Sequence, residues 1–592
     1  MWLINTENLL HLVWQTHGDM LEQATKVFLL DNAPHDSSSP HNTTSAKILE
    51  RATSETAPSY AILSHTWPPE GSALEEVSFE EITAPTLSAS TLASWGFAKI
   101  LKTCEIAFMK HHLRHAWVDT CCIDKSSSSE LSESINSMFK WYRQAELCIA
   151  FLDDLEPLND DATSTETVTD QLESCRWFTR GWTLQELIAP QRLEVYDRTW
   201  TLVADRTNLA DAISNICGVS TGILRGRDYL HETPVCVRMS WAAKRKTTRK
   251  EDEAYCLLGI FDVNMPMLYG EGPKAFFRLQ EEIIKDNPDM SIFAWIDRQP
   301  EFLYSGLFAS SPAMFDGMGD AVRLPNAASD IFDFSSTNRS VKIQARLGFS
   351  RLSGYAFLSI GHNWIHSPYL EKLAITLRQV GPDSFVRVHK PLVAPQNDTL
   401  DSIKSVLIPK YLTRQQAWRT ENRVMQIMQP EDPYEHPDFR LADIEPPGCW
   451  DSSTSTFFSG YLDSFVGYLH FRPDWADEFD SFVLVCWHTA VYHPAHAVMG
   501  WRYDLLPGDH WAKIKPDYLD HYRASTVLEG PRLPKALRLP HLYDESKSKL
   551  VVLESDDGHR LHFQRSALSL KIVHAPSRND LARYFDDYCG DG

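Results

Sequence analysis

The segment Trp-Thr-Leu-Gln-Glu-Leu at residues 182–187 places a carboxylate close to an indole. On a helix, Trp182 and Glu186 are four residues apart and share a face, while Leu184, Leu187 and Ile188 can point to the core. A carboxylate beside an indole suits hydrolysis of an N-glycosidic bond, because it can stabilise the oxocarbenium-like sugar that remains when the base departs. Glu186 is therefore our candidate catalytic residue.

A structural role for the same glutamate stays open at this point. Arg176 and Arg180 lie in the preceding residues, and a partly exposed helix glutamate paired with either arginine would look the same in the sequence. If the segment is catalytic, Arg180 and Trp182 are candidates for substrate binding.

Further polar residues follow short apolar runs that are typical of buried strands. These runs are residues 59–64 (SYAILS), the start of HAWVDTCCID at 115–124, and 147–152 (LCIAFL). Between them lie two segments with helical apolar spacing, 94–113 and 127–146; the second begins with Ser127 and Glu130 in a capping-box pattern. The order strand, helix, strand, helix, strand predicts right-handed crossovers and a mostly parallel sheet.

Ligands of such sheets bind beyond the carboxyl ends of the strands, where we expect Ser64, Asp119 and Asp153. Ser64 is expected to line the crevice. Asp119 either orients a ligand hydroxyl or caps a turn, and for Asp124 we favour the turn cap. Ser64 and His65 are adjacent on a strand and point to opposite faces, so they do not form a nucleophile–base pair.

The cysteines and histidines favour no metal or disulfide framework. The chain has 11 cysteines without a C-x-x-C pair, which indicates a reducing compartment and hence a cytoplasmic protein. Cys121 and Cys122 are expected in the core rather than as nucleophiles. His111, His112 and His115 are close in sequence, but no carboxylate completes a ligand set, so we assign no metal.

The rest of the chain divides into three predicted regions. Residues 1–218 form the α/β domain, 219–290 a helical connector, and 291–592 a β-rich C-terminal region of short strands between Pro, Gly and Asp breaks. Residues 153–173 are expected to be an exposed loop, and the basic run at 243–250 a solvated linker.

Net charge and hydropathy exclude some classes of partner. The formal net charge of −22 argues against general binding of nucleic acid or anionic lipid. Residues 481–501 contain no Asp, Glu, Lys or Arg, but their His, Pro and β-prone residues favour a soluble strand over a membrane span.

Three blocks of this sequence closely resemble the fungal heterokaryon-incompatibility (HET) domain: YAILSHTW (60–67), residues 115–146 and RWFTRGWTLQELIAP (176–190). Residues 240–284 resemble the segment that follows this domain in many such proteins. The chain has Trp67-Pro68 where the family usually has Trp-Gly. We recognise nothing in residues 300–592.

WTLQEL is also similar to the Trp-Cys-Leu-x-Glu-Leu stretch of plant TIR domains, whose glutamate is associated with cleavage of NAD. This similarity implies a TIR-like, flavodoxin-like order of strands. It also implies NAD as a substrate rather than a cofactor, with Glu186 as the catalytic residue.

The resemblance implies a protein of self/non-self recognition and innate immunity that triggers programmed cell death, either as a NAD glycohydrolase or as a non-enzymatic adaptor. The adaptor would act by self-association of the HET domain when the rest of the chain senses a partner protein. In both cases the incompatibility partner is unidentified, and homo-oligomerisation stays open. A pocket joining Ser64, Asp119 and Glu186 would favour the enzyme, whereas a flat apolar surface with Glu186 pointing away would favour the adaptor.

Overall fold

We describe the protein from a computed structural model. The structure describes residues 1–23, 25–26, 48–53, 57–69, 71–157, 165–299, 304–323, 331–350, 355–364, 372–381, 383–389, 392, 399–413, 416–417, 424–428, 439–451, 456–458, 464–473, 481–489, 502–517, 536–539, 549–555 and 567–574. The chain forms two compact units. The N-terminal unit comprises Met1–Trp295 and Ala309–Val322, and the C-terminal unit comprises Ile296–Phe308 and Arg323–Gly592.

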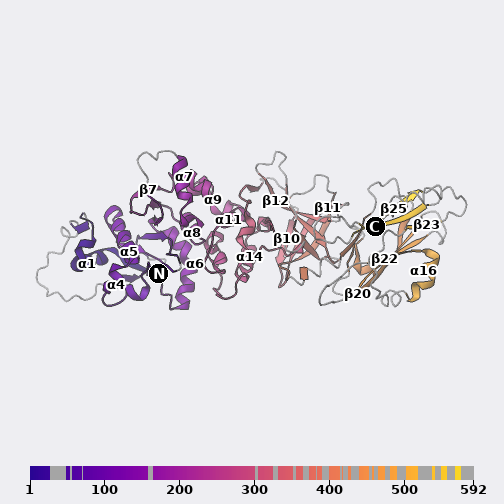
Figure 1. Cartoon of the computed structure of the whole chain (residues 1–592), viewed down its shortest axis with the longest axis horizontal. Helices are drawn as coiled ribbons and strands as arrows, with labels where there is room; N and C mark the ends of the chain where they lie inside the picture. The colour runs from indigo at the N-terminus through magenta and orange to yellow at the C-terminus, as the bar shows by residue number, and fades with distance from the viewer. Residues whose placement is uncertain are drawn as a thin grey trace. The chain divides into compact units, whose positions relative to one another are not determined.

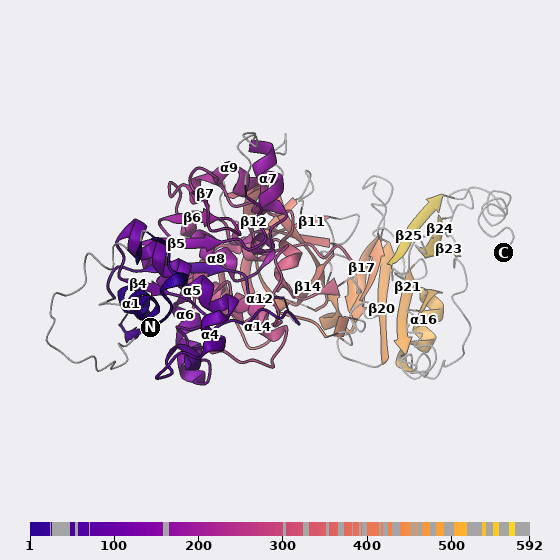
Figure 2. The same cartoon turned by 60° about the vertical axis from the view of Figure 1, so that its left-hand side comes forward.

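A seven-stranded sheet forms the centre of the N-terminal unit, with strand order β2-β1-β4-β3-β5-β6-β7. Its strands are β1 (Trp2–Asn5), β2 (Leu49–Arg51), β3 (Ala61–His65), β4 (His115–Trp117), β5 (Leu147–Phe151), β6 (Leu193–Tyr196) and β7 (Leu202–Asp205). The four middle strands are parallel, with Ala61 level with Ala116 and with Leu147. The predicted parallel arrangement of β3, β4 and β5 is therefore confirmed, and Figure 2 shows β5, β6 and β7 following one another.

The edges of this sheet are antiparallel, which makes it mixed. β1 pairs antiparallel with both β2 and β4, and β7 pairs antiparallel with β6. These edge strands were not part of the predicted sheet. They are short, and their pairing depends on contacts between residues distant in sequence.

The N-terminal unit also contains many helices, some of which pack against the sheet (Figure 1). The longer ones are α1 (Thr6–His17), α5 (Trp95–Glu105), α6 (Ser128–Gln144), α7 (Thr165–Glu173), α9 (Ala210–Cys217) and α14 (Lys274–Asp286). The shorter ones are α3 (Phe79–Ile82), α4 (Ala89–Ala93), α8 (Thr183–Ile188), α10 (Thr221–Leu224), α11 (Val235–Ser240), α12 (Asp252–Tyr255) and α13 (Leu258–Phe261). Ser94 and Ser127 cap α5 and α6 by accepting backbone N–H hydrogen bonds, as the sequence around them predicts.

Two local predictions are wrong. Residues 165–173, expected as part of an exposed loop, form α7, whose Leu172 is buried. The prediction missed this helix because Thr and acidic residues dominate the stretch. The second strand ends at Trp117 rather than at Asp119, because the chain turns after Val118, where Cys122 donates its N–H to the Val118 carbonyl.

The C-terminal unit is rich in strands, as predicted. One sheet has the order β10-β11-β12-β13-β14-β8 with β15 on β11, a second the order β18-β19-β16-β25-β24-β23, and a third the order β17-β20-β21-β22. The strands are β8 (Tyr304–Ser305), β10 (Ile331–Ser336), β11 (Ser340–Ser350), β12 (Tyr355–Trp364), β13 (Lys372–Gln379), β14 (Phe385–Val388), β15 (Thr399–Pro409), β16 (Val424–Met428), β17 (Phe439–Glu445), β18 (Trp450–Asp451), β19 (Thr456–Phe458), β20 (Ser464–Pro473), β21 (Phe482–Thr489), β22 (Arg502–Pro507), β23 (Ala536–Leu539), β24 (Lys549–Ser555) and β25 (Ala567–His574). The helix α16 (Gly508–Ile514) places Trp511 against Tyr468 of β20, with ring centroids 4.7 Å apart.

The charge-free stretch 481–501 begins as a strand. β21 covers residues 482–489 and pairs with β20 and β22, while 490–501 lie outside the described residues. Within the part of the chain that the structure describes, no helix is long and apolar enough to cross a membrane.

Candidate functional site

Glu186 lies on α8, a helix of six residues that follows a short 3-10 turn at Arg176–Thr179. Pro190 follows the helix and prevents its continuation. The Glu186 residue is only 7% exposed. Its Oε2 atom accepts a hydrogen bond of 2.5 Å from Ser64 Oγ at the end of β3, and Ser64 Oγ accepts one of 2.8 Å from the Trp177 indole N–H. Trp177, Ser64 and Glu186 thus form a buried, directed chain.

Burial raises the pKa of Glu186 to about 8. The hydrogen bond from Ser64 opposes this shift, and the negative charge of Asp119 adds to it. The Glu186 carboxyl group is therefore mostly protonated at neutral pH in the free protein. Carboxyl groups with such shifts are concentrated at functional sites, although structural networks also produce them.

The structure does not have the arginine pairing that the structural alternative for Glu186 assumes. Glu186 is buried rather than partly exposed, and Arg176 binds Asp153 at 2.6 Å and Asp154 at 3.2 Å instead. Arg180 donates to Thr248 Oγ1 at 3.5 Å, and its charge lowers the pKa of Glu186 only as a minor influence. Neither arginine forms an ion pair with Glu186.

Trp182 stands at the beginning of α8 and makes a different contact from Glu186. Its side chain hydrogen-bonds to Asp252, which also accepts a bond of 3.1 Å from the Tyr269 hydroxyl. The structure therefore directs Trp182 and Glu186 to different partners, although the four-residue spacing predicts a shared face. Trp182 lies before the first residue of α8 but has right-handed helical dihedral angles (φ −62°, ψ −35°), so two residues on a shared face can still have different partners.

Asp119 and His65 belong to a second polar chain. His65 Nε2 lies 2.9 Å from Asp119 Oδ1, and Asp119 Oδ2 accepts a 2.9 Å bond from the Trp67 indole N–H. Burial by itself would raise the pKa of Asp119, but His65, Lys125 and Trp67 together hold it well below its usual range. Asp119 therefore binds side chains rather than capping a turn, whereas Asp124 accepts from the Ser126 backbone N–H as expected of a turn cap.

The other nitrogen of His65 contacts a buried lysine. Lys99 Nζ lies 2.6 Å from His65 Nδ1 and 2.5 Å from Glu76 Oε1. A charged lysine can only donate, so Nδ1 accepts and the proton of a neutral His65 sits on Nε2, facing Asp119. Ser64 and His65 thus point to opposite faces of β3, as predicted, and each lies in its own network.

Ser64 and Glu186 are the two predicted site residues that the structure brings into contact. Asp119 is near enough for its charge to act on Glu186, but it bonds to His65 and Trp67. The sequence reasoning missed Trp177 and Lys99. A lysine between Ala98 and Ile100 on a helix is itself a signal, because a buried lysine needs an anionic partner.

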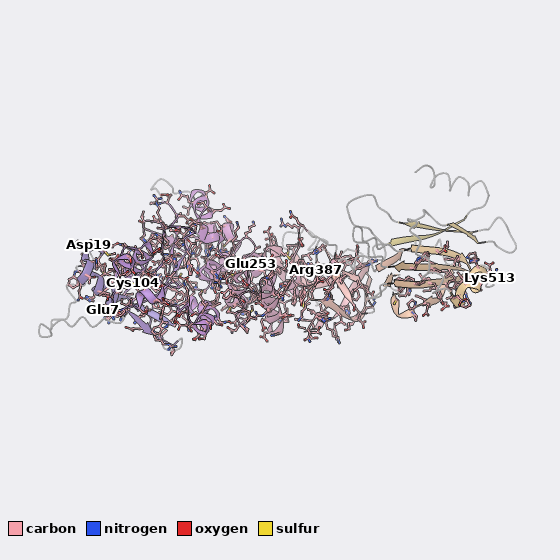
Figure 3. The ribbon with its side chains drawn as sticks, turned by 60° about the horizontal axis from the view of Figure 1, so that its bottom comes forward. Glu7, Asp19, Cys104, Glu253, Arg387 and Lys513 are labelled. Atoms are coloured by element: carbon pink, nitrogen blue, oxygen red, sulfur yellow. The ribbon has the colours of Figure 1, made fainter. Side chains whose placement is uncertain are left out.

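Most of the described cysteines of this unit are core residues, and Cys217 is partly exposed. Cys121 and Cys122 are buried, and burial and contact with Cys122 raise the pKa of Cys121 well above its usual value. Cys104, labelled in Figure 3, is completely buried among the side chains of the same unit. Ten cysteines lie in the described residues, and all ten are free thiols.

These observations define an α/β protein whose parallel strands end at a buried carboxyl group held by a serine. Residues 60–170 match the model of the heterokaryon incompatibility protein (HET) family, and residues 274–306 match that of a domain of unknown function (DUF8212). The chain therefore carries a HET domain.

A relative supports this assignment over a longer stretch. Over 231 residues the chain is 45% identical to the vegetative incompatibility protein HET-E-1 of Podospora anserina. The match covers 39% of this chain but only 16% of that relative. No solved structure matches the chain.

Proposed function

We propose that this protein acts in heterokaryon (vegetative) incompatibility, and that its HET domain triggers cell death by hydrolysing NAD. The similarity to a vegetative incompatibility protein and the match to the HET family support the first part. The buried contact between Ser64 and Glu186 at the carboxyl end of β3 carries the second.

In the proposed reaction, water replaces nicotinamide on the ribose of NAD. The bond between the pyridinium nitrogen and the ribose carbon breaks, and nicotinamide leaves as a neutral base with the electron pair of that bond. Water forms the new carbon–oxygen bond and loses a proton to solvent. The Glu186 carboxylate stabilises the positive charge on the ribose in the transition state, and the Ser64 hydroxyl orients that carboxylate.

A cationic substrate would also change the protonation state of Glu186. The pyridinium charge of NAD next to the buried carboxyl favours its ionised form and offsets the cost of burial. A buried acid that is protonated when free and ionised when a cation binds is consistent with this substrate.

The test compares wild type with Glu186→Gln in a fungal host, at matched protein levels. We expect Glu186→Gln to abolish killing and the fall in cellular NAD, and to slow nicotinamide release by the purified protein about 100- to 1,000-fold. Killing by Glu186→Gln at the wild-type rate, or death without a fall in NAD, would refute the enzymatic proposal.

The second candidate is a non-enzymatic adaptor that acts by self-association of the HET domain. Trp67 and Leu74, which follow β3, are 42% and 45% exposed and favour this alternative. Under it, Glu186→Gln kills normally, whereas Trp67→Ala or Leu74→Asp abolishes killing and any oligomer.

The proposal also covers the location of the protein and the roles of its regions. We propose a cytoplasmic location, recognition of an incompatibility partner through the β-rich residues 291–592, and the HET domain within residues 1–218. The helices of 219–290 would connect these two regions.

A further inference from the structure

The short helix that carries Glu186 is held by residues beyond the match to the HET family. Arg245 Nη1 donates to the Arg180 carbonyl at 2.8 Å and to Thr183 Oγ1 at 3.0 Å. Thr183 is the first residue of α8, and Arg180 lies three residues before it. Residues 243–250, expected to be a solvated linker, therefore include a partly buried arginine that is bonded to this helix.

The backbone of the same basic segment pairs with the residues just before α8. The Lys246 N–H donates to the Thr179 carbonyl at 2.7 Å, and the Gly181 N–H donates to the Lys246 carbonyl at 2.9 Å. Gly181 allows this close approach, since a Cβ atom there would lie 2.5 Å from Thr247 Cγ2 and 3.2 Å from Cys256 Sγ. The two segments are thus in close backbone contact.

A third contact comes from α12. Asp252 accepts hydrogen bonds from Trp182 and from the Tyr269 hydroxyl. Burial raises the pKa of Asp252, and these two donors oppose that shift. Glu253, labelled in Figure 3, marks the position of this segment within the unit.

The helix depends on these contacts for its position. α8 has six residues and no side-chain cap at its N-terminus. A helix this short is not stable by itself, so tertiary contacts must fix it. Ser64 holds Glu186 from the sheet, whereas Arg245, Lys246 and Asp252 fix the residues at which the helix begins.

We propose that Arg245 and Asp252 are positioning residues for Glu186, and that the segment Arg245–Cys256 clamps α8 against the sheet. The functional unit of the HET domain then extends beyond residues 60–170 and 1–218 to include this segment. The expected effect on catalysis rests on the proposed function, but the proposal that this segment fixes the position of α8 does not.

The first test measures hydrogen exchange of the backbone amides in the full chain. We expect Arg245→Gln to speed exchange in residues 180–188 by about tenfold or more, because two hydrogen bonds from a charged donor are lost. Arg245→Lys, which keeps the charge but not the forked geometry, should have a smaller effect. Exchange in α1, at the other edge of the sheet, should be unchanged in both variants.

Lys246→Gln is the matched control. It removes the same unit charge one residue away, but the Lys246 side chain is exposed and its backbone makes the contacts. Exchange in residues 180–188 should therefore match wild type. Equal exchange in Arg245→Gln and Lys246→Gln would overturn the proposal.

A second, milder variant tests the same contacts if Arg245→Gln does not fold. Trp182→Phe keeps an aromatic ring but removes the N–H that binds Asp252, and it should also speed exchange in residues 180–188. In the nicotinamide-release assay, the loss in Arg245→Gln should fall on kcat with KM nearly unchanged, because α8 is misplaced. If wild type releases no nicotinamide while exchange responds as expected, the NAD proposal fails and the clamp stands.

Discussion

Ser64 Oγ donates a 2.5 Å hydrogen bond to Glu186 Oε2, joining residues 122 positions apart in the sequence. Because Ser64 Oγ also accepts from the Trp177 indole, its own proton is directed to the carboxyl group. This direction suits both protonation states of Glu186, since Oε2 accepts in each. The contact ties the end of a parallel strand to the helix that carries the candidate catalytic acid.

Ser64→Ala removes the Ser64 hydroxyl, so each of its two buried partners loses a hydrogen bond. Trp177 Nε1 loses its acceptor, and the remaining support for the Glu186 carboxylate weakens, so the pKa of Glu186 should rise further. We expect a loss of about 1–3 kcal/mol in unfolding free energy. Urea denaturation of the full chain, taken on the transition of the N-terminal unit, measures it.

Ser128→Ala is the control for this substitution, because Ser128 is exposed in the first turn of α6. Its effect should stay within about 0.5 kcal/mol. A Ser64→Ala variant as stable as Ser128→Ala would show that the 2.5 Å contact contributes nothing.

Lys99→Met should destabilise the folded protein more than the similar volumes of the two side chains suggest. The Lys99 side chain is 2% exposed and bound to Glu76, so the substitution leaves that carboxylate without its cation and His65 Nδ1 without its donor. We expect a cost of about 3 kcal/mol or more in unfolding free energy. Lys285→Met breaks an exposed pair with Glu282 and should cost less than about 1 kcal/mol in the same assay. Similar costs for the two variants would argue that Lys99 is not buried in an ion pair.

Thiol labelling tests the expected redox state. After denaturation without reductant, nearly all 11 cysteines should react. In the native chain the partly exposed Cys217 and Cys449 should react before the eight buried thiols of the described residues. Several thiols that remain protected after denaturation until a reductant is added would reveal disulfides and contradict a reducing compartment.

The central strands and their order were predictable because apolar runs alternate with amphipathic helices. β3, β4 and β5 are short and almost entirely buried, so their sequences are continuous apolar runs, which parallel sheets require. α7 was not predicted, because Thr and acidic residues outnumber apolar ones in its sequence, although its apolar residues Val168 and Leu172 have helical spacing.

The site was only partly predictable for a different reason. Residue type and spacing pointed to Ser64 and Glu186, but the partners of Glu186 depend on how α8 packs against β3. Spacing within a segment also could not show that Trp182 binds Asp252, a residue far along the chain on another helix. The burial of Glu186, and with it the shift of its pKa, exists only in the folded chain.

That shift predicts how Glu186→Gln changes stability with pH. The pKa of Glu186 is about 8 in the folded protein against an ordinary value of 4.5. Between these two values the folded protein holds a proton that the unfolded chain releases. The contribution of Glu186 to stability is therefore fully present below pH 4.5 and is lost as the pH rises through about 8. The glutamine side chain of the variant resembles the protonated acid but does not titrate.

We therefore expect Glu186→Gln to melt close to wild type at about pH 5 and several degrees above it at about pH 9. Scanning calorimetry of the full chain across this pH range measures the difference. The control is Glu133→Gln, at an exposed position on α6, whose difference from wild type should be small and nearly constant. A Glu186→Gln variant that tracks wild type at every pH would mean that Glu186 is not held in a buried site. The carboxyl group would then be free to point away from Ser64, which is the geometry that the adaptor alternative requires.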